Sequence, residues 1–263
     1  MPATRHLRSV PAGPSAHPPA QPRVLLVDDV PGEAANFAVA FGSQLTAVCG
    51  LDELDAALSA GNTWDVAFVD FNLSSTVNTG LSVLLTLHRE RPATRLVTYS
   101  QFAENGRVLF AAAARHWFGA QAVLDKSQND PYALRHHAIA LVAGLDPSPV
   151  QWRTRLHRAH LIDAVLPDLS WVDRWRALDA AAGDVTAAAA LLHLKAAHLR
   201  SFKDRATNAV NQVNAALFDL PDRGPSRNKK GILGTFVAQH TSFLTAADLP
   251  AALAHRDLAT AVR

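Results

Sequence analysis

The sequence has a single cysteine and no apolar run close to the about 20 residues that a membrane-spanning helix needs. Cys49 therefore cannot form an intramolecular disulfide, and we expect a protein of the reducing cytoplasm. The proline-rich first 22 residues lack the apolar core of a secretory signal, which makes a disordered tail the better interpretation. We expect neither secretion nor a membrane partner.

Signatures of catalysis are also absent. No glycine-rich phosphate-binding loop is present, and the second half of the chain has no nucleophile–base motif. The twelve histidines are scattered, and the pairs His136-His137 and His157/His160 have no cysteine or carboxylate at a spacing that would complete a metal site. We therefore expect a binding or regulatory protein and not an enzyme.

Charge is unevenly distributed along the chain. Residues 1–145 hold 10 Lys and Arg against 12 Asp and Glu, whereas residues 146–263 hold 15 against 11. An acidic first part followed by a mildly basic second part fits a regulatory module joined to a region that meets an anion.

The first part alternates short apolar runs with segments of helical periodicity. Apolar strands are expected at residues 23–27, 44–49, 64–70, 95–100 and 122–125. Helices are expected at residues 33–41, 51–60, from 80 to about 90, 104–117 and 131–142. Strict alternation over five units predicts an α/β doubly wound (βα)5 domain with a parallel sheet.

Reactive side chains follow four of these strands. Asp28-Asp29, Asp70, Ser100 and Lys126 each come at the carboxyl end of a strand, and a parallel sheet brings those ends to one edge. Several carboxylates at one edge suit a hard divalent cation, typically Mg²⁺.

These residues, in this order on these elements, resemble the receiver domain of two-component response regulators across residues 22–145. The resemblance implies that Asp70 accepts a phosphoryl group from a histidine kinase, while Lys126 and Ser100 bind the phosphoryl oxygens. It also implies a metal site formed by Asp29 and Asp70, by Asp28 through water, and by the backbone carbonyl of Asn72.

Two features depart from the family pattern. Val123, three residues before Lys126, stands where the family usually has the Tyr or Phe that swings inward on activation. Gly80 follows Asp70 by ten residues where eight is more usual, and Ser74 stands where the family often has proline. Either another group relays the signal, or phosphorylation and output are weakly coupled.

The second part is predicted to be all-α. Residues 146–149 read as a linker and 150–165 as one amphipathic helix, followed by a helix opened by a capping box at Ser170 and Asp173. A short helix capped by Thr186, a turn at 193–195 and a long helix from Ala196 then resemble the helix-turn-helix of the LuxR/NarL and Fis groups. Two residues depart from the pattern of these groups. His193 stands where glycine is common, and Lys195 stands where Ser or Thr usually caps the second helix.

The long helix has an apolar stripe and an opposite polar face. The stripe consists of Leu199, Phe202, Ala206, Val210, Val213 and Leu217. On the polar side, His198, Ser201 and Arg205 are candidates for base contacts, and Lys195, Arg200 and Lys203 for phosphate contacts. An ordinary helical hairpin with a solvated face remains the alternative.

The expected organisation is a disordered tail (1–21), a receiver domain (22–145), a linker and connecting helix (146–169), a helix-turn-helix domain (170–220), and a basic loop with two C-terminal helices (221–263). We interpret the chain as a dimeric response regulator that binds DNA. Two alternatives stay open: an adaptor whose helical output binds a protein partner, and a DNA-binding regulator that works without phosphorylation.

Overall fold

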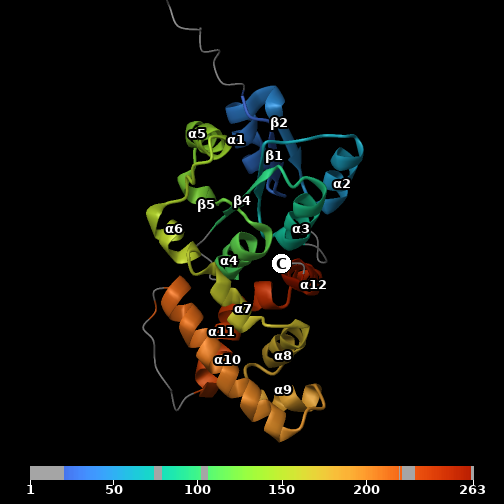
Figure 1. The fold of residues 1–263 in the computed structure, drawn as a ribbon, viewed down its shortest axis with the longest axis vertical. Helices are drawn as coiled ribbons and strands as arrows, with labels where there is room; N and C mark the ends of the chain where they lie inside the picture. The colour runs from blue at the N-terminus through green and yellow to red at the C-terminus, as the bar shows by residue number, and fades with distance from the viewer. Residues whose placement is uncertain (1–20, 74–78, 102–105, 219, 221–228, 262–263) are drawn as a thin grey trace, which may run out of the picture.

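The computed structural model describes residues 21–73, 79–101, 106–218, 220 and 229–261. A parallel five-stranded sheet forms the first part, and a cluster of helices forms the second (Figure 1). The predicted tail at residues 1–21 falls almost entirely outside the described residues.

The sheet has the strand order β2-β1-β3-β4-β5, with every neighbouring pair parallel. Its strands are β1 (Val24–Val27), β2 (Leu45–Val48), β3 (Val66–Val69), β4 (Arg95–Ser100) and β5 (Ala122–Asp125). All five lie inside the predicted segments. Strands β1 and β3 are completely buried, as expected for central strands covered on both faces.

Helices cover both faces of the sheet. On one face, α1 (Pro31–Phe41) and α5 (Pro131–Val142) pack against residues such as Leu26, Phe68 and Tyr99. On the other face, α2 (Leu51–Ser59), α3 (Gly80–Glu90) and α4 (Gly106–Phe118) pack against residues such as Leu25, Val69 and Val123. This arrangement confirms the predicted (βα)5 fold.

The helical part contains α6 (Val150–Leu156), α7 (Ile162–Val165), α8 (Leu169–Ala180), α9 (Val185–Leu191), α10 (Ala196–Leu217), α11 (Lys229–Leu244) and α12 (Leu249–Ala261), with a 3-10 turn at Ala159–Leu161. A bundle of helices after a doubly wound domain confirms the all-α second part. The C-terminal pair of helices was also predicted.

Three local predictions were wrong. Residues 150–165 form two short helices and a 3-10 turn, because the chain leaves helical geometry at Arg158 (φ −104°, ψ 16°). The cap of α8 is Asp168, whose carboxylate accepts a hydrogen bond from Ser170 N. The cap of α9 is Asp184, whose carboxylate accepts from the amides of Thr186 and Ala187. In both caps a carboxylate two residues earlier takes the role that we assigned to a hydroxyl.

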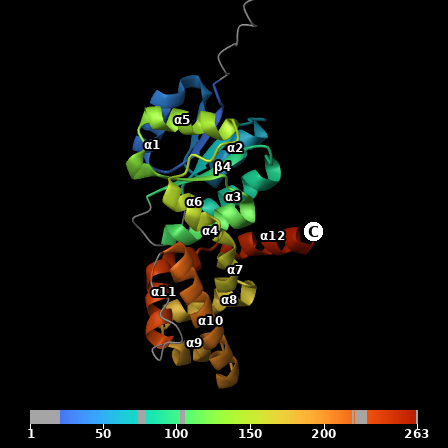
Figure 2. The same ribbon diagram turned by 60° about the vertical axis from the view of Figure 1, so that its left-hand side comes forward.

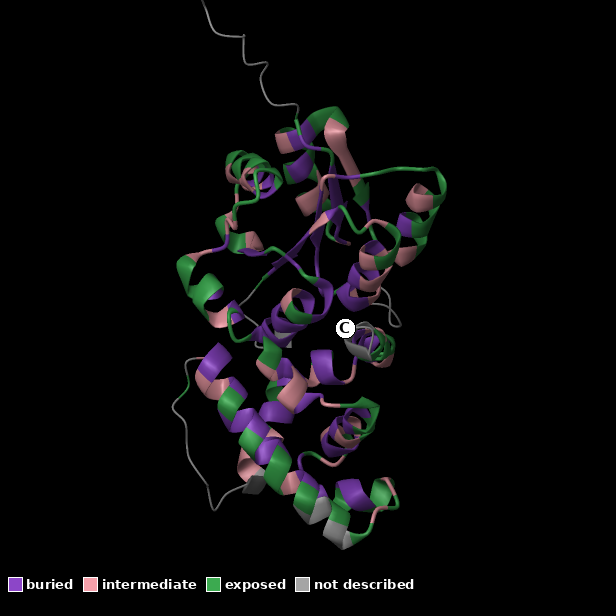
Figure 3. Ribbon diagram, viewed as in Figure 1, coloured by how far each residue is buried: buried purple, intermediate pink, exposed green. Residues whose placement is uncertain are grey.

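One hydrophobic core extends from the sheet through α3 and α4 into the helical part. Figure 3 shows buried segments on the facing sides of both parts. In the helical part, the indole rings of Trp171 and Trp175 lie 4.9 and 5.7 Å from the ring of Phe202. Gly183 has a left-handed backbone (φ +77°) and lies so close to Gly234 that a β-carbon would meet its Cα at 2.5 Å.

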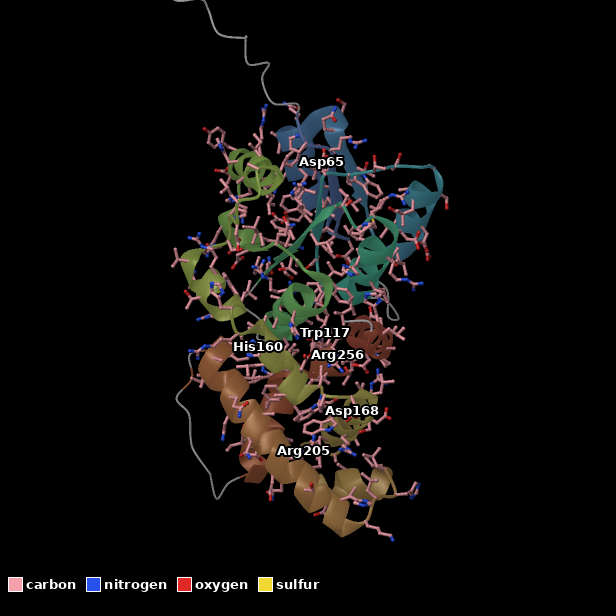
Figure 4. All side chains as sticks on the ribbon, in the orientation of Figure 1. Asp65, Trp117, His160, Asp168, Arg205 and Arg256 are labelled. Carbon is pink, nitrogen blue, oxygen red and sulfur yellow. The ribbon has the colours of Figure 1, made fainter. Side chains whose placement is uncertain are left out.

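The C-terminal helices return to the first part of the chain. Helix α11 packs against α4, and α12 packs against α3 (Figure 2). At this junction the Asp163 carboxylate accepts hydrogen bonds from Trp117 Nε1 at 2.9 Å and Arg256 Nη1 at 3.0 Å. Figure 4 labels Trp117 and Arg256, whose guanidinium lies 5.7 Å from the indole centroid. Within the described ranges, no helix combines the length and apolarity that crossing a bilayer requires.

Candidate functional site

The carboxyl edge of the sheet brings together the residues predicted to form the site. Asp28 and Asp29 follow β1, Asp70 follows β3, Ser100 ends β4, and Lys126 follows β5. Asp28, Asp70 and Ser100 are 4%, 3% and 0% exposed, so the groups face one another inside the protein and not solvent.

Asp70 is held by donors on both carboxylate oxygens. Its Oδ2 accepts a hydrogen bond from Lys126 Nζ at 2.7 Å. Its Oδ1 accepts one from the amide of Phe71 at 2.7 Å and another from Ser100 Oγ. Charge-assisted bonds of this kind fix the orientation of a carboxylate, which is what a nucleophile in a defined line of attack requires.

Lys126 also bridges to Asp28. Its Nζ lies 2.6 Å from Asp28 Oδ2, and its side chain is 5% exposed. Burial raises the pKa of Asp28 to about 6, against the opposing effect of Lys126. Burial lowers the pKa of Lys126, but the charges and hydrogen bonds of Asp70 and Asp28 outweigh it and raise that pKa above its ordinary value. The ammonium therefore stays charged at neutral pH.

The three carboxylates fit a divalent cation. Asp28, Asp29 and Asp70 each offer one oxygen, and these oxygens lie within 4.8 Å of one another. Asp28 Oδ2 is buried 2.6 Å from Lys126 Nζ, and a carboxylate oxygen with one such partner keeps a lone pair for a cation. An all-oxygen donor set suits a hard cation such as Mg²⁺ or Ca²⁺. Asn72 is exposed two residues after Asp70, and the role of its carbonyl stays a prediction.

Arg107 is a member of the site that the sequence analysis missed. It lies in the first turn of α4, is 7% exposed, and donates a hydrogen bond from Nη1 to Ser100 Oγ at 2.6 Å. The same nitrogen lies 3.6 Å from Asp70 Oδ1. A signal existed in the sequence, because Arg107 directly precedes the buried apolar run 108–114, where a charge needs a partner.

The segment after Asp70 is fixed by close backbone contacts. The amide of Gly80 donates to the carbonyl of Phe71 at 2.9 Å. A β-carbon on Gly80 would lie 2.1 Å from the Asp70 carbonyl oxygen and 2.9 Å from Phe110 Cζ. Glycine is therefore required where α3 begins, since any other residue would place a β-carbon against the Asp70 carbonyl oxygen. Ser74 lies outside the described residues.

Val123 lies in the buried core that includes Trp152 and Leu156 of α6. Its amide donates to Ser148 Oγ at 2.9 Å, and Ser148 is itself 3% exposed. The linker after α5 therefore closes over β5 at the position where the family carries its mobile ring.

The candidate DNA contacts lie around the start of α10. Lys195, His198, Ser201 and Arg205 are exposed, Lys203 is partly exposed, and the side chains of Arg200 and Leu199 lie outside the described residues. The turn before α10 has the predicted form: His193 adopts a left-handed backbone (φ +52°), and Lys195 at the N-cap makes no side-chain capping bond. The buried residues Phe202, Ala206, Val210, Val213 and Leu217 confirm the rest of the apolar stripe.

Arg205 differs from the other candidates. Its guanidinium lies 5.3 Å from the ring centroid of Trp171, a buried residue of α8, although the residue as a whole is exposed (Figure 4). A cation–π contact of this kind holds the side chain against the protein. Reaching a base edge would require Arg205 to leave it, so the remaining exposed residues are the better candidates.

Comparisons with known proteins give a fold but no close relative. No family model and no curated protein matches the sequence. Among solved structures, RcsB from Salmonella enterica serovar Typhimurium, bound to the promoter P1flhDC with the phosphomimetic BeF3−, has a TM-score of 0.51 at 16% identity, covering 84% of this chain and 99% of RcsB. A structure of two RcsB dimers bound to two parallel DNAs has a TM-score of 0.50 at 15% identity, covering 82% and 97%.

RcsB is described as a response regulator. The likeness covers both the sheet and the helical part, and it confirms, at the level of the fold, the resemblance inferred from the sequence. The chain has the fold of a receiver domain followed by a helix-turn-helix domain.

Proposed function

We propose that this chain is a response regulator: Asp70 accepts a phosphoryl group from a partner histidine kinase, and the helical part binds DNA. The observation that carries the proposal is the Lys126 ammonium within 2.7 Å of Asp70, beside two further carboxylates. Burying an unpaired aspartate would cost free energy. A carboxylate held by a cation, a hydroxyl and an amide stays ionised and oriented, as a nucleophile must be.

The transfer needs one bond made and one broken. A carboxylate oxygen of Asp70 attacks the phosphorus of a phosphohistidine and forms an acyl phosphate. The phosphorus–nitrogen bond breaks, its electron pair stays on the histidine ring, and the ring takes a proton from solvent. Lys126 and Ser100, which both contact Asp70, would bind the phosphoryl oxygens, and binding them is most of what this reaction requires of a protein.

A divalent cation belongs to the proposal. Asp28, Asp29 and Asp70 would hold it, with the carbonyl of Asn72 as a further ligand, and Mg²⁺ is the ion we expect. When bound, it neutralises charge on the phosphoryl oxygens. The ion pair between Asp28 and Lys126 would then help to keep the carboxylate of Asp70 oriented, because Lys126 contacts both.

DNA binding is supported by the exposed polar start of α10 and by RcsB, whose structures with DNA share this fold. Lys195 and Lys203 would contact phosphates, and His198 and Ser201 would face base edges. Two copies of the chain would present two such helices to two half-sites, so we propose a homodimer on DNA. A cytoplasmic location, which the lone cysteine favours, belongs to the same proposal.

The experiment that tests phosphorylation uses the full chain with acetyl phosphate and Mg²⁺. The wild type should gain one base-labile phosphoryl group, and Asp70→Asn should gain none. The control is Asp65→Asn, which changes the carboxylate just before the same strand, at the end opposite Asp70. Equal uptake by wild type and Asp70→Asn would contradict the proposal.

A second candidate function is regulation of DNA binding without phosphorylation. It is favoured by Val123, which is buried under the linker and offers no mobile ring. Under this alternative Asp70→Asn binds DNA with the wild-type affinity, whether or not a phosphoryl donor is present.

A further inference from the structure

We propose that Arg107 is a phosphoryl-binding residue that couples Asp70 to α4, and through α4 to the helical part of the protein. This inference rests on the proposed phosphorylation of Asp70. It assigns the coupling to a residue outside the set of strand-end side chains that the sequence pointed to.

A single atom, Ser100 Oγ, links the guanidinium of Arg107 to the carboxylate of Asp70. Its Nη1 donates to Ser100 Oγ, and Ser100 Oγ in turn donates to Asp70 Oδ1. The direct distance from Nη1 to Asp70 Oδ1, 3.6 Å, is too long for a good hydrogen bond. Acceptor oxygens added to Asp70 would come within reach of this guanidinium.

The charges at the site favour the same conclusion. Three carboxylates, Asp28, Asp29 and Asp70, meet two cations, Lys126 and Arg107. A phosphoryl group adds further negative charge and three strong acceptor oxygens. A guanidinium offers several N–H donors in a planar fork that matches phosphate geometry, which a second lysine would not provide. Its burial makes each such bond stronger than it would be in water.

Helix α4 carries the effect away from the site. Beyond Arg107, residues 108–114 are all buried, so the helix has little freedom to absorb a local movement. Its Phe110 ring lies 4.9 Å from the ring of Phe71, which lies 6.1 Å from Phe243 of α11. Arg107 thus lies at the site end of a packed path that reaches the output helices.

The path also accounts for Val123. Val123 has no aromatic ring to swing inward, and it is buried beside the linker residue Ser148, which accepts a hydrogen bond from its amide. Coupling through α4 needs no such ring, because the group that responds is the guanidinium of Arg107.

The test measures binding of beryllofluoride (BeF3−), a phosphoryl mimic, to the full chain in saturating Mg²⁺. Arg107→Gln should weaken the apparent affinity about tenfold or more, because a buried charge-assisted contact is lost. Arg115→Gln changes the other arginine of α4, whose Nη1 donates to the carbonyls of Ala120 and Gln121, and should leave the affinity unchanged. Mg²⁺ affinity should not fall in Arg107→Gln, because the substitution removes a positive charge that repels Mg²⁺ from the site.

A second measurement observes the wild type itself, and a variant serves only to assign the signal. In arginine side-chain NMR spectra of the wild type, the Nε–H signal of Arg107 should shift when BeF3− is added, while that of Arg115 should not. The signal is assigned from its loss in Arg107→Lys. An unmoved Arg107 signal, or equal BeF3− affinity in Arg107→Gln and wild type, overturns the role of Arg107.

Failure of the underlying function is distinguishable. If wild type binds no BeF3−, or if Asp70→Asn binds it equally well, the phosphorylation proposal fails and the role of Arg107 fails with it. If wild type binds and Asp70→Asn does not, the affinity of Arg107→Gln and the Arg107 signal of the wild type decide this inference.

Discussion

The carboxylate of Asp248 lies at the N-terminus of α3, where its Oδ2 accepts a hydrogen bond from the amide of Thr79 at 2.7 Å. The same carboxylate accepts hydrogen bonds from the amide of Ser82 at 3.0 Å and from the hydroxyl groups of Thr79 and Ser82. A residue from the far end of the chain thus caps the helix that follows Asp70. The sheet domain and the helical part are joined by a specific polar contact as well as by apolar packing.

Asp248→Ala should lower the free energy of unfolding by about 2 kcal/mol, because four partly buried donors lose this acceptor. Chemical denaturation of the full chain measures the change. The control is Asp173→Ala, an exposed carboxylate on α8 for which we expect less than about 0.5 kcal/mol. Equal effects of the two substitutions would show that the cap contributes nothing specific.

Gly80→Ala should destabilise the protein by about 2 kcal/mol or more, because the new β-carbon would overlap the Asp70 carbonyl oxygen. Phosphoryl uptake from acetyl phosphate should fall with it, since the acceptor strand end must shift. The matched control is Gly32→Ala in α1, where a β-carbon meets nothing within 4 Å. The prediction is wrong if Gly80→Ala has the same free energy of unfolding as the wild type and the same phosphoryl uptake.

Divalent-cation affinity should fall as the pH drops through about 6. Burial raises the pKa of Asp28 to about 6, so below that pH a proton occupies the carboxylate that the cation needs. The affinity should decline by up to about tenfold per pH unit below the pKa and level off above it. Calorimetric titration with Mg²⁺ between pH 5 and 8 measures this.

The same shift has the opposite effect on the cation-free protein. The native state binds the Asp28 proton more tightly than the unfolded chain, so this residue lowers stability as the pH rises from about 4 to about 6. Asp28→Asn should remove both pH dependences. A cation affinity that stays constant from pH 5 to 8 in the wild type would contradict the assignment of Asp28.

Lys195→Ala should weaken DNA binding by the full chain and make it less sensitive to salt. One lost phosphate contact lowers the slope of log affinity against log salt by about 1. The same substitution should change affinity for all sequences alike, whereas His198→Ala should relax sequence preference. Arg135→Gln, an exposed arginine on α5, is the control for loss of charge. Salt-independent binding would point instead to a protein partner.

Much of the sheet and its site could be predicted because both depend on local pattern. Each strand is a short apolar run, and Asp70 and Lys126 follow their strands directly. Parallel strand order then brings their side chains together without further information. The stripe of α10 from Phe202 to Leu217 was predictable for the same reason, since helical spacing alone defines a buried face.

Contacts between distant segments could not be predicted. Arg107 reaches Ser100 only because α4 packs across the end of β4, and Asp248 meets Thr79 only because the chain folds back after α11. The single helix expected at 150–165 was wrong because apolar spacing persists through the break near Arg158. Sequence periodicity reports which face is buried, and it does not report where the backbone turns.

The return of α12 to α3 has a consequence for synthesis. Because the chain leaves the ribosome N-terminus first, the whole sheet domain emerges before the residues from Asp248 to Ala261 that cover α3 exist. At typical elongation rates of about 5–20 residues per second, the apolar side of α3 and α4 stays uncovered for on the order of ten seconds. A nascent chain stalled before α12 should therefore be a better chaperone client than the finished protein.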